Sequence, residues 1–227
     1  MRVIRYSILA SLLAALALLA GCATTKPYDY SAYQSHPPQS ILVLPPINQS
    51  VDVNAPYIYL STISVPLAEH GYYVFPVAVV DSFMKDNGVA EPAEMQQVPL
   101  AKLDQAFGPD AVLYTTINDW GQKYHVISSD ATVELTSHLV DVDSGATIWK
   151  GHTRLVQSSN NGSGSLLAEA VVALVQQVAG STHDYTRQVS GQANTQMIGN
   201  PNQGLPYGPY NPKSATDARR VSATTSR

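Results

Sequence analysis

The sequence is poor in charged residues and contains a single cysteine. Charged residues make up 13% of its 227 residues, about half of the ~25% that is usual in globular domains. The formal net charge is −4, so no positive field is available to attract nucleic acid, and we expect no nucleic-acid partner. One cysteine cannot form a disulfide within the chain or build a cysteine-based zinc site. Apolar residues nevertheless reach 44%, which is enough for a folded core and excludes disorder of the whole chain.

The first residues have the pattern of an export signal. Arg2 and Arg5 are the only charged residues before Lys26, and an apolar stretch of 14 residues, 7–20, follows them. This stretch is too short for a membrane-spanning helix, which needs about 20 residues. It has the length of a signal-peptide core, about 7–15 residues. We therefore predict a signal peptide over residues 1–21.

The signal peptide ends in Leu19-Ala20-Gly21-Cys22, which resembles the lipobox of bacterial lipoproteins. The resemblance implies cleavage between Gly21 and Cys22 and attachment of acyl chains such as palmitate to Cys22. Ala23, rather than aspartate, follows the cysteine. By the sorting rule of Gram-negative lipoproteins this implies an anchor in the outer membrane that faces the periplasm, with exposure at the cell surface left open. The alternative is a secreted protein with an incidental cysteine, or a buried helix.

Composition divides the mature chain into three parts. Residues 22–39 hold three prolines and three tyrosines without an apolar period, which predicts a lipidated N-terminus and a flexible tether. Residues 40–188 have the regular apolar patterns of one α/β domain. Residues 189–227 are rich in glycine, proline and polar residues, which predicts a mostly disordered tail.

Within the domain, helices first separate the strands and strands then follow one another directly. This order predicts a mixed sheet of about five strands, with parallel crossovers followed by an antiparallel meander and with helices packed on it. Asp143-Ser144-Gly145 is expected to form the turn of a hairpin. The expected strands are 41–44, 72–75, 111–120 with a continuation over 124–127, 132–142 and 146–156, and the expected helices are 57–70, 77–86, 99–107 and 166–178.

Recognisable reaction motifs are missing from the sequence. It contains no glycine-rich phosphate loop with lysine, no Gly-x-Ser-x-Gly elbow and no His-Glu-x-x-His, the motifs typical of several enzyme classes. Residues 162–165 open the last expected helix, where a flexible loop with Ser165 as the helix cap is expected rather than an anion site, because the lysine of a phosphate loop is missing. Glu91 and Glu94 lie in a proline-rich region, where solvated carboxylates are expected rather than a catalytic pair.

Two groups of polar residues resemble metal ligands. His125, His138 and His152 fall on neighbouring strands of the meander, where exposed strand histidines are expected rather than a zinc site on a shared face. Asp141-x-Asp143-x-Gly145 resembles the start of a calcium loop. Its glycine comes one place too early, however, and no glutamate follows at the required distance. We therefore favour a turn for this segment.

Tyrosine is unusually frequent, with 13 residues, whereas phenylalanine occurs three times. Tyrosine suits half-wet surfaces such as protein interfaces. We take Tyr57, Tyr59, Tyr72 and Tyr73 as a candidate contact surface, with packing at the edge of the core as the alternative.

Four stretches of the sequence carry a family resemblance: 66–77, 107–121, 139–151 and 205–212. Together they are similar to a family of outer-membrane lipoproteins of unknown function, which includes genome-derived lipoprotein antigens of Gram-negative pathogens. The resemblance covers about residues 20 to 212, and Gly-Tyr-Tyr-Val-Phe-Pro is its most specific motif. It implies a fold similar to the amino-terminal domain of TolB and partners such as the CsgG-like lipoproteins that family members often accompany. It supplies no catalytic residues.

The last of these stretches lies in the predicted tail. The resemblance there implies that residues 205–212 dock on the domain through Leu205, Tyr207 and Tyr210.

These features favour a non-catalytic, lipid-anchored lipoprotein that faces the periplasm and assists an envelope assembly, secretion or transport complex. One alternative is a periplasmic binding module for glycan or peptide, which requires a deep pocket with polar anchors. Another is a hydrolase whose site carries no recognisable motif. No cofactor is expected, and the oligomeric state is left open, with a dimer as one alternative.

Overall fold

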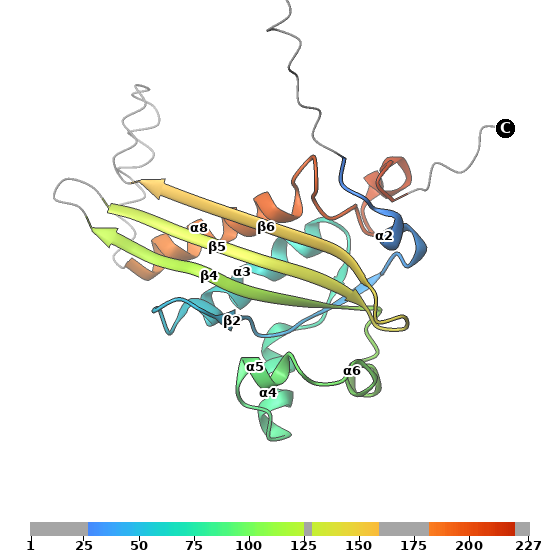
Figure 1. Cartoon of the computed structure of the whole chain (residues 1–227), viewed down its shortest axis with the longest axis horizontal. Coiled ribbons are helices and arrows are strands. Elements are labelled where there is room, and N and C mark those ends of the chain that lie inside the picture. The colour runs from blue at the N-terminus through green and yellow to red at the C-terminus, as the bar shows by residue number, and fades with distance from the viewer. Residues whose placement is uncertain (1–26, 125–128, 159–181, 221–227) are drawn as a thin grey trace, which may run out of the picture.

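Six strands organise the chain in a computed structural model that describes residues 27–124, 129–158 and 182–220 (Figure 1). They are β1 (Ser40–Val43), β2 (Ile47–Asn48), β3 (Tyr73–Val74), β4 (Ala111–Tyr124), β5 (Ser129–Asp141) and β6 (Thr147–Ser158). Their order in the sheet is β3-β1-β4-β5-β6, and β2 pairs with β4 beside this path. The predicted signal peptide, Cys22 and the predicted helix 166–178 lie outside the described residues.

Parallel and antiparallel pairing meet in this sheet. β1 runs parallel to both β3 and β4, whereas β4, β5 and β6 form an antiparallel meander. Ile41, Leu42 and Val43 of β1 are fully buried, as expected for a strand that is covered on both faces. The predicted fold class, a mixed sheet with crossovers followed by a meander, is confirmed.

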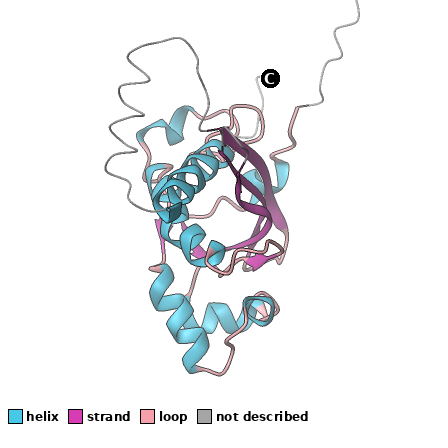
Figure 2. Cartoon of the chain, turned by 90° about the vertical axis from the view of Figure 1, so that its left-hand side faces the viewer, coloured by secondary structure: helices cyan, strands magenta, loops and turns pink. Residues whose placement is uncertain are grey.

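Helices pack on both faces of the sheet, but among the described residues one face is covered only at its β1 end, and the meander is open there (Figure 1). The helices are α2 (Ser31–Ser35), α3 (Ala55–Glu69), α4 (Val77–Asp86), α5 (Pro92–Met95), α6 (Leu100–Phe107) and α8 (Thr182–Ile198), and a 3-10 helix spans Pro212–Thr216. The long helices α3 and α8 pack together along one face of the strongly twisted sheet (Figure 2). None of the helices in these ranges combines the length and the apolar content that crossing a bilayer requires.

Side chains alternate between the two faces along β1, so this one strand contributes to two hydrophobic clusters. Ile41 and Val43 join the cluster under α3 and α8, whereas Leu42 and Leu44 join the cluster under α4, α5 and α6. Successive side chains of a strand point to opposite faces, so the continuous apolar run at 41–44 is the pattern that this position requires.

The hairpin between β5 and β6 turns where the sequence predicts it. Gly145 has φ +68°, a backbone conformation that glycine adopts without strain. Its N–H donates to the carbonyl oxygen of Asp141 at 2.9 Å. The side chain of Asp141 accepts a second hydrogen bond from the N–H of Ser144 at 2.8 Å.

Residues 28–39 pack on the domain, so the predicted flexible tether is wrong for them. Tyr33 is fully buried, and its hydroxyl lies 2.7 Å from the hydroxyl of Tyr72. Tyr30 donates a hydrogen bond to the carbonyl oxygen of Gly204 at 2.7 Å. Composition alone missed this because buried tyrosines combine a large apolar area with a hydroxyl group that must find a partner.

The predicted disordered tail is wrong for residues 189–220. Val189, Ala193 and Met197 of α8 are buried at a spacing of four residues. Ser190 and Asn194 are also fully buried. Because polar residues share this buried stripe, the apolar period of the helix is too weak to recognise in the sequence.

Residues 205–212 pack against the C-terminal end of α3, as the family resemblance implies. Leu205 is buried, and the carbonyl oxygen of Pro206 accepts a hydrogen bond from the hydroxyl of Tyr72 at 2.5 Å. The ring of Tyr207 stacks on His70 at a centroid distance of 4.4 Å. Tyr210 differs from the expectation because its side chain is 66% exposed.

Candidate functional site

The four tyrosines predicted as a contact surface do not lie together. Tyr57 and Tyr73 are 61% and 52% exposed, whereas Tyr59 and Tyr72 are buried. The hydroxyl of Tyr59 lies 2.8 Å from Thr115 Oγ1, and burial raises the pKa of Tyr59. Residues two apart on a helix point to opposite sides, and neighbours on a strand alternate between its faces. The contact-surface prediction is therefore wrong for Tyr59 and Tyr72, which belong to the core.

Tyr73 begins a row of aromatic rings that passes from β3 to α6 and on to α4. Ring centroids are 5.1 Å apart for Tyr73 and Phe75, 6.3 Å for Phe75 and Phe107, and 4.9 Å for Phe107 and Phe83. The planes meet at 79°, 70° and 69°, the edge-to-face arrangement that aromatic pairs favour. The row contains all three phenylalanines of the chain. Their rarity was the sequence signal that could have drawn attention to Phe83 and Phe107.

α4 presents two apolar stripes on different sides. Val80 and Met84 are buried against the sheet, with 1% and 3% exposure. Val79 and Phe83 are 59% and 41% exposed. Residues four apart on a helix share a face, so Val79 and Phe83 form a stripe that solvent reaches.

Tyr57 lies at the other end of α4 from Tyr73. Lys85 Nζ is 5.6 Å from the centre of the Tyr57 ring, and it is also 2.6 Å from Asp81 Oδ2. The hydrogen bond from Lys85 to Asp81 raises the pKa of the lysine, so its ammonium group is charged near the Tyr57 ring, a favourable cation–π arrangement. These contacts place the start of α3 beside the end of α4.

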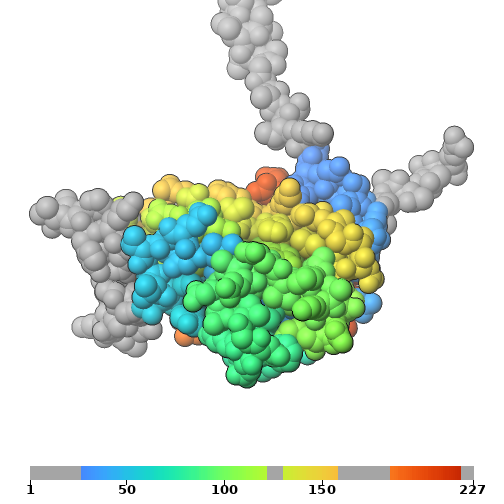
Figure 3. All heavy atoms as spheres, turned by 60° about the horizontal axis from the view of Figure 1, so that its bottom comes forward, coloured from blue at the N-terminus to red at the C-terminus, as the bar shows by residue number. Residues whose placement is uncertain are grey.

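We define the α4 surface as Tyr73, Val79 and Phe83. Tyr57 is not part of it, because Asp81 and Lys85 beside Tyr57 point to the other side of α4 from Val79 and Phe83. In Figure 3 the layer of α4, α5 and α6, in green, projects toward the viewer beside the start of α3, in blue. The surface is aromatic and aliphatic, with charged groups beside it, a composition typical of protein interfaces. A partner protein could bury these aromatic and aliphatic side chains on contact.

Only two of the three meander histidines lie in the part of the chain that the structure describes. The ring of His138 stacks on Tyr114 at 5.0 Å, and its pKa is lowered by burial and then by the charge of Lys150. His152 Nε2 lies 3.3 Å from Glu134 Oε1. His125 lies outside the described residues. Within the ranges that the structure covers, no three histidine, cysteine or acidic side chains are placed to hold a metal ion.

The other candidate polar groups serve local structure or lie in solvent. The carboxylate of Asp141 accepts hydrogen bonds within the hairpin turn, and Asp143 is exposed. Glu91 precedes α5 and Glu94 lies in its first turn, and both are exposed. Residues 162–165 lie outside the described residues.

Comparison with known proteins gives consistent matches. Residues 28–210 match the model of a family described as "Putative lipoprotein GNA1162-like". The chain is 42% identical over 183 residues to a lipoprotein of Neisseria meningitidis serogroup B, NMB1124/NMB1162, a match that covers 80% of this chain and 85% of that protein. It is also similar to the crystal structure of lipoprotein GNA1162 from Neisseria meningitidis. That match has a TM-score of 0.52 and 44% identity, and it covers 63% of this chain and 100% of the crystal chain.

Proposed function

The chain belongs to the GNA1162-like lipoprotein family, and from this premise we propose that it acts by contact, as a lipid-anchored accessory protein of an envelope complex. Membership in a lipoprotein family implies membrane anchoring and a location in the cell envelope. The finer proposal is an anchor in the outer membrane, with the domain facing the periplasm.

The proposed anchor is Cys22, whose sulfur carries a diacylglycerol thioether and whose α-amine, freed by cleavage after Gly21, is acylated. The lipobox at residues 19–22 and Ala23 after it support this assignment. Two or three acyl chains hold a protein firmly, since each buried methylene group contributes about 0.8 kcal/mol.

The observation that carries the proposed contact role is the exposed α4 surface. In Figures 1 and 2 the layer of α4, α5 and α6 lies at the bottom of the molecule, whereas α2, which follows the lipidated N-terminus in sequence, lies higher. An anchored domain would therefore turn its apolar contact surface away from its own attachment point. A partner within the envelope is able to reach it there.

The proposed partners are proteins, and the CsgG-like lipoproteins that the family resemblance implies are the first class to test. Apolar groups dominate the α4 surface, and burying such groups drives protein association. No catalytic step, cofactor or nucleic acid enters this proposal.

The α4 surface is tested by placing one charge in it. Val79→Glu and Phe83→Glu, each made in the full-length lipoprotein, are expected to keep the fold because both side chains are partly exposed. They are expected to abolish photo-crosslinks that a probe at Tyr73 forms with envelope proteins. Val156→Glu is the matched control, since Val156 is a 47% exposed valine on β6, away from α4.

Two results would contradict the proposal. Folded Val79→Glu and Phe83→Glu variants that keep every crosslink would remove the α4 surface from consideration. Turnover of glycan or peptide substrates by the purified protein would refute the non-catalytic role.

A further inference from the structure

Few residues separate the proposed anchor from the folded domain. Pro27 is the first described residue, only five positions after Cys22. Five residues cannot span more than roughly 18 Å even when fully extended. Because residues 28–39 pack on the domain, an acylated Cys22 would hold the domain close to the membrane surface.

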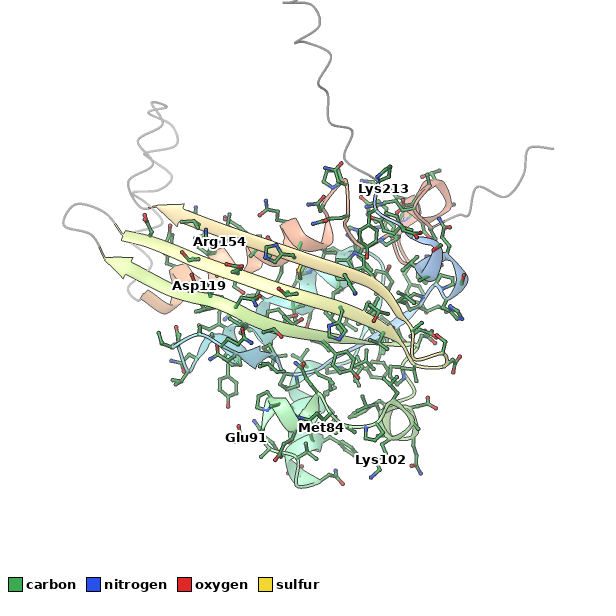
Figure 4. The ribbon with its side chains drawn as sticks, in the orientation of Figure 1. Met84, Glu91, Lys102, Asp119, Arg154 and Lys213 are labelled. Carbon is green, nitrogen blue, oxygen red and sulfur yellow. The ribbon has the colours of Figure 1, made fainter. Side chains whose placement is uncertain are left out.

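The side of the domain next to this attachment point is built from both ends of the chain. The hydroxyl of Tyr30 donates to the carbonyl oxygen of Gly204 at 2.7 Å. The side-chain amide of Gln34 donates to the carbonyl oxygen of Arg219 at 3.1 Å. We call residues 27–35 and 199–220 together the terminal face. Figure 4 shows Lys213 of this face near the top of the molecule, with Met84 and Lys102 at the opposite end.

Charge is distributed unevenly between these two ends. From Cys22 onward the chain has 11 basic and 17 acidic residues, and residues 77–107 alone have five acidic against two basic residues. The terminal face reverses this balance. It carries Lys213, Arg219 and Arg220 against Asp29 and Asp217.

Lys150 adds a fourth basic group next to the terminal face. Its backbone N–H donates to the hydroxyl of Tyr28 at 2.7 Å, and its side chain is exposed. Arg219 forms an ion pair with Asp217 at 2.8 Å, so those two charges compensate each other. Glu69 is an exposed acidic neighbour, and its carbonyl oxygen accepts a hydrogen bond from Asn211 Nδ2 at 2.8 Å. The exposed Lys150 and Lys213 and the half-buried Arg220 then stand against Asp29 and Glu69, which leaves this side positive.

An exposed aromatic ring accompanies these charges. The N–H of Tyr210 donates to the carbonyl oxygen of Gly71 at 3.1 Å, which fixes its backbone, while its side chain is 66% exposed. Tyrosine is enriched where proteins meet the headgroup region of a bilayer. Basic side chains are attracted by anionic lipid headgroups.

We propose that the terminal face, together with Lys150, lies on the anionic phospholipid surface to which the protein is anchored. This inference rests on the proposed acylation of Cys22. It deepens that proposal, because it states which side of the domain meets the membrane. The acidic layer of α4, α5 and α6 then points away from the lipid, and the α4 surface stays free for a protein partner.

The orientation is tested with single thiol probes. Cys22 is the only cysteine, so its acylation leaves Ala215→Cys and Ala78→Cys each with one free thiol for a fluorophore. Both alanines are exposed, the first on the terminal face and the second on α4. The acylated full-length variants are reconstituted into vesicles of phosphatidylethanolamine and phosphatidylglycerol that contain a lipid with a spin-labelled headgroup. Quenching is expected to be several-fold stronger at position 215 than at position 78.

A charge variant tests the recognition of the headgroups. Lys213→Gln is expected to weaken membrane contact of the terminal face about fivefold, since each basic residue near an anionic surface contributes on this scale. The same loss of quenching is expected when phosphatidylcholine replaces phosphatidylglycerol. Lys102→Gln, an exposed lysine on α6, is the matched control and should leave the quenching unchanged.

The outcomes separate the inference from the proposed function. Mass spectrometry first establishes whether Cys22 is acylated, and a chain without acyl groups would refute the anchor itself. An acylated chain with equal quenching at positions 215 and 78, or with stronger quenching at 78, would refute the proposed orientation. If quenching is stronger at position 215 but is changed neither by replacing phosphatidylglycerol with phosphatidylcholine nor by Lys213→Gln, recognition of the headgroups by charge would be refuted.

Discussion

At the scale of single residues, the tyrosines divide into two functional kinds. Tyr59 is fully buried, and its hydroxyl continues through Thr115 Oγ1 to Ser137 Oγ with two distances of 2.8 Å. Buried hydroxyl groups need partners, so Tyr59 completes a polar chain inside the core. Tyr57, two residues earlier, has its ring near Lys85 at the surface.

This division predicts different responses to removal of a hydroxyl group. Tyr59→Phe should lower the free energy of unfolding by about 1 kcal/mol, the typical contribution of one buried hydrogen bond. Tyr57→Phe should leave it unchanged within the error of urea denaturation. Equal stability of both variants and the parent chain would show that the buried hydroxyl chain contributes nothing.

At position 145 the positive φ angle of the backbone favours glycine. A β-carbon there would lie 3.9 Å from Leu100 Cδ1, an ordinary contact, so the strain arises from φ +68° rather than from space. Gly145→Val should destabilise the domain by about 1 kcal/mol or more. The control is Gly191→Ala within α8, where no atom lies within 4 Å of the added carbon and a gain of up to about 1 kcal/mol is expected. A thermal midpoint that Gly145→Val leaves unchanged would contradict this reading of the turn.

At the scale of elements, the sequence predicts those parts whose side chains follow a simple period. β5 and β6 alternate between the two faces of the sheet, and α4 and α6 begin near prolines, so each was predicted close to its observed bounds. β2 has two residues, too few for any period. Parts of the fold held by polar contacts, such as Ser190 and Asn194 of α8 against Thr62, carry no apolar signal at all.

The candidate site shows the same limit. The sequence predicts helix 77–86 and includes Tyr73 among the contact residues, but it does not identify Val79 and Phe83. Each of these two is followed directly by another apolar residue, Val80 and Met84. Only the packing of α4 decides which stripe is buried and which one solvent reaches.

The burial of His70 predicts that the contact between the C-terminal end of α3 and the C-terminal segment depends on pH. Its Nε2 lies 2.9 Å from the carbonyl oxygen of Leu205. Burial lowers its pKa below the ordinary 6.5, and the hydrogen bond to Leu205 opposes this in part. The unfolded chain therefore binds a proton more readily than the folded one. The stabilisation is complete above about pH 6.5 and is lost as the pH falls from there toward the lower pKa of the folded state.

The expected result is a thermal midpoint that falls on acidification from about pH 7.5 to about pH 5.5, on either side of the ordinary histidine pKa. His70→Gln should reduce that fall. His36→Gln is the control, because the side chain of His36 is exposed and its backbone N–H donates to the carbonyl oxygen of Tyr33 within its own segment. A fall that is as large in His70→Gln as in the parent chain would assign the pH dependence to other groups.

At the scale of the whole molecule, the two ends of the domain differ in chemistry. The terminal face is basic, with an exposed tyrosine, and the opposite layer is acidic, with an exposed apolar surface. The family match confirms the resemblance that four stretches of sequence carry. The arrangement of these ends could not be predicted, because the sequence places residues 27–35 and 199–220 far apart and only the fold brings them together.

The central claim is that this chain works while anchored through Cys22, and the direct measurement is mass spectrometry of the mature N-terminus from envelope membranes. The account predicts a chain that begins at Cys22 and carries a diacylglycerol thioether with an acylated α-amine. It also predicts that Cys22→Ala remains an uncleaved precursor that incorporates no radiolabelled palmitate. Palmitate incorporation by Cys22→Ala, or a mature parent chain with an unmodified Cys22, would contradict the account.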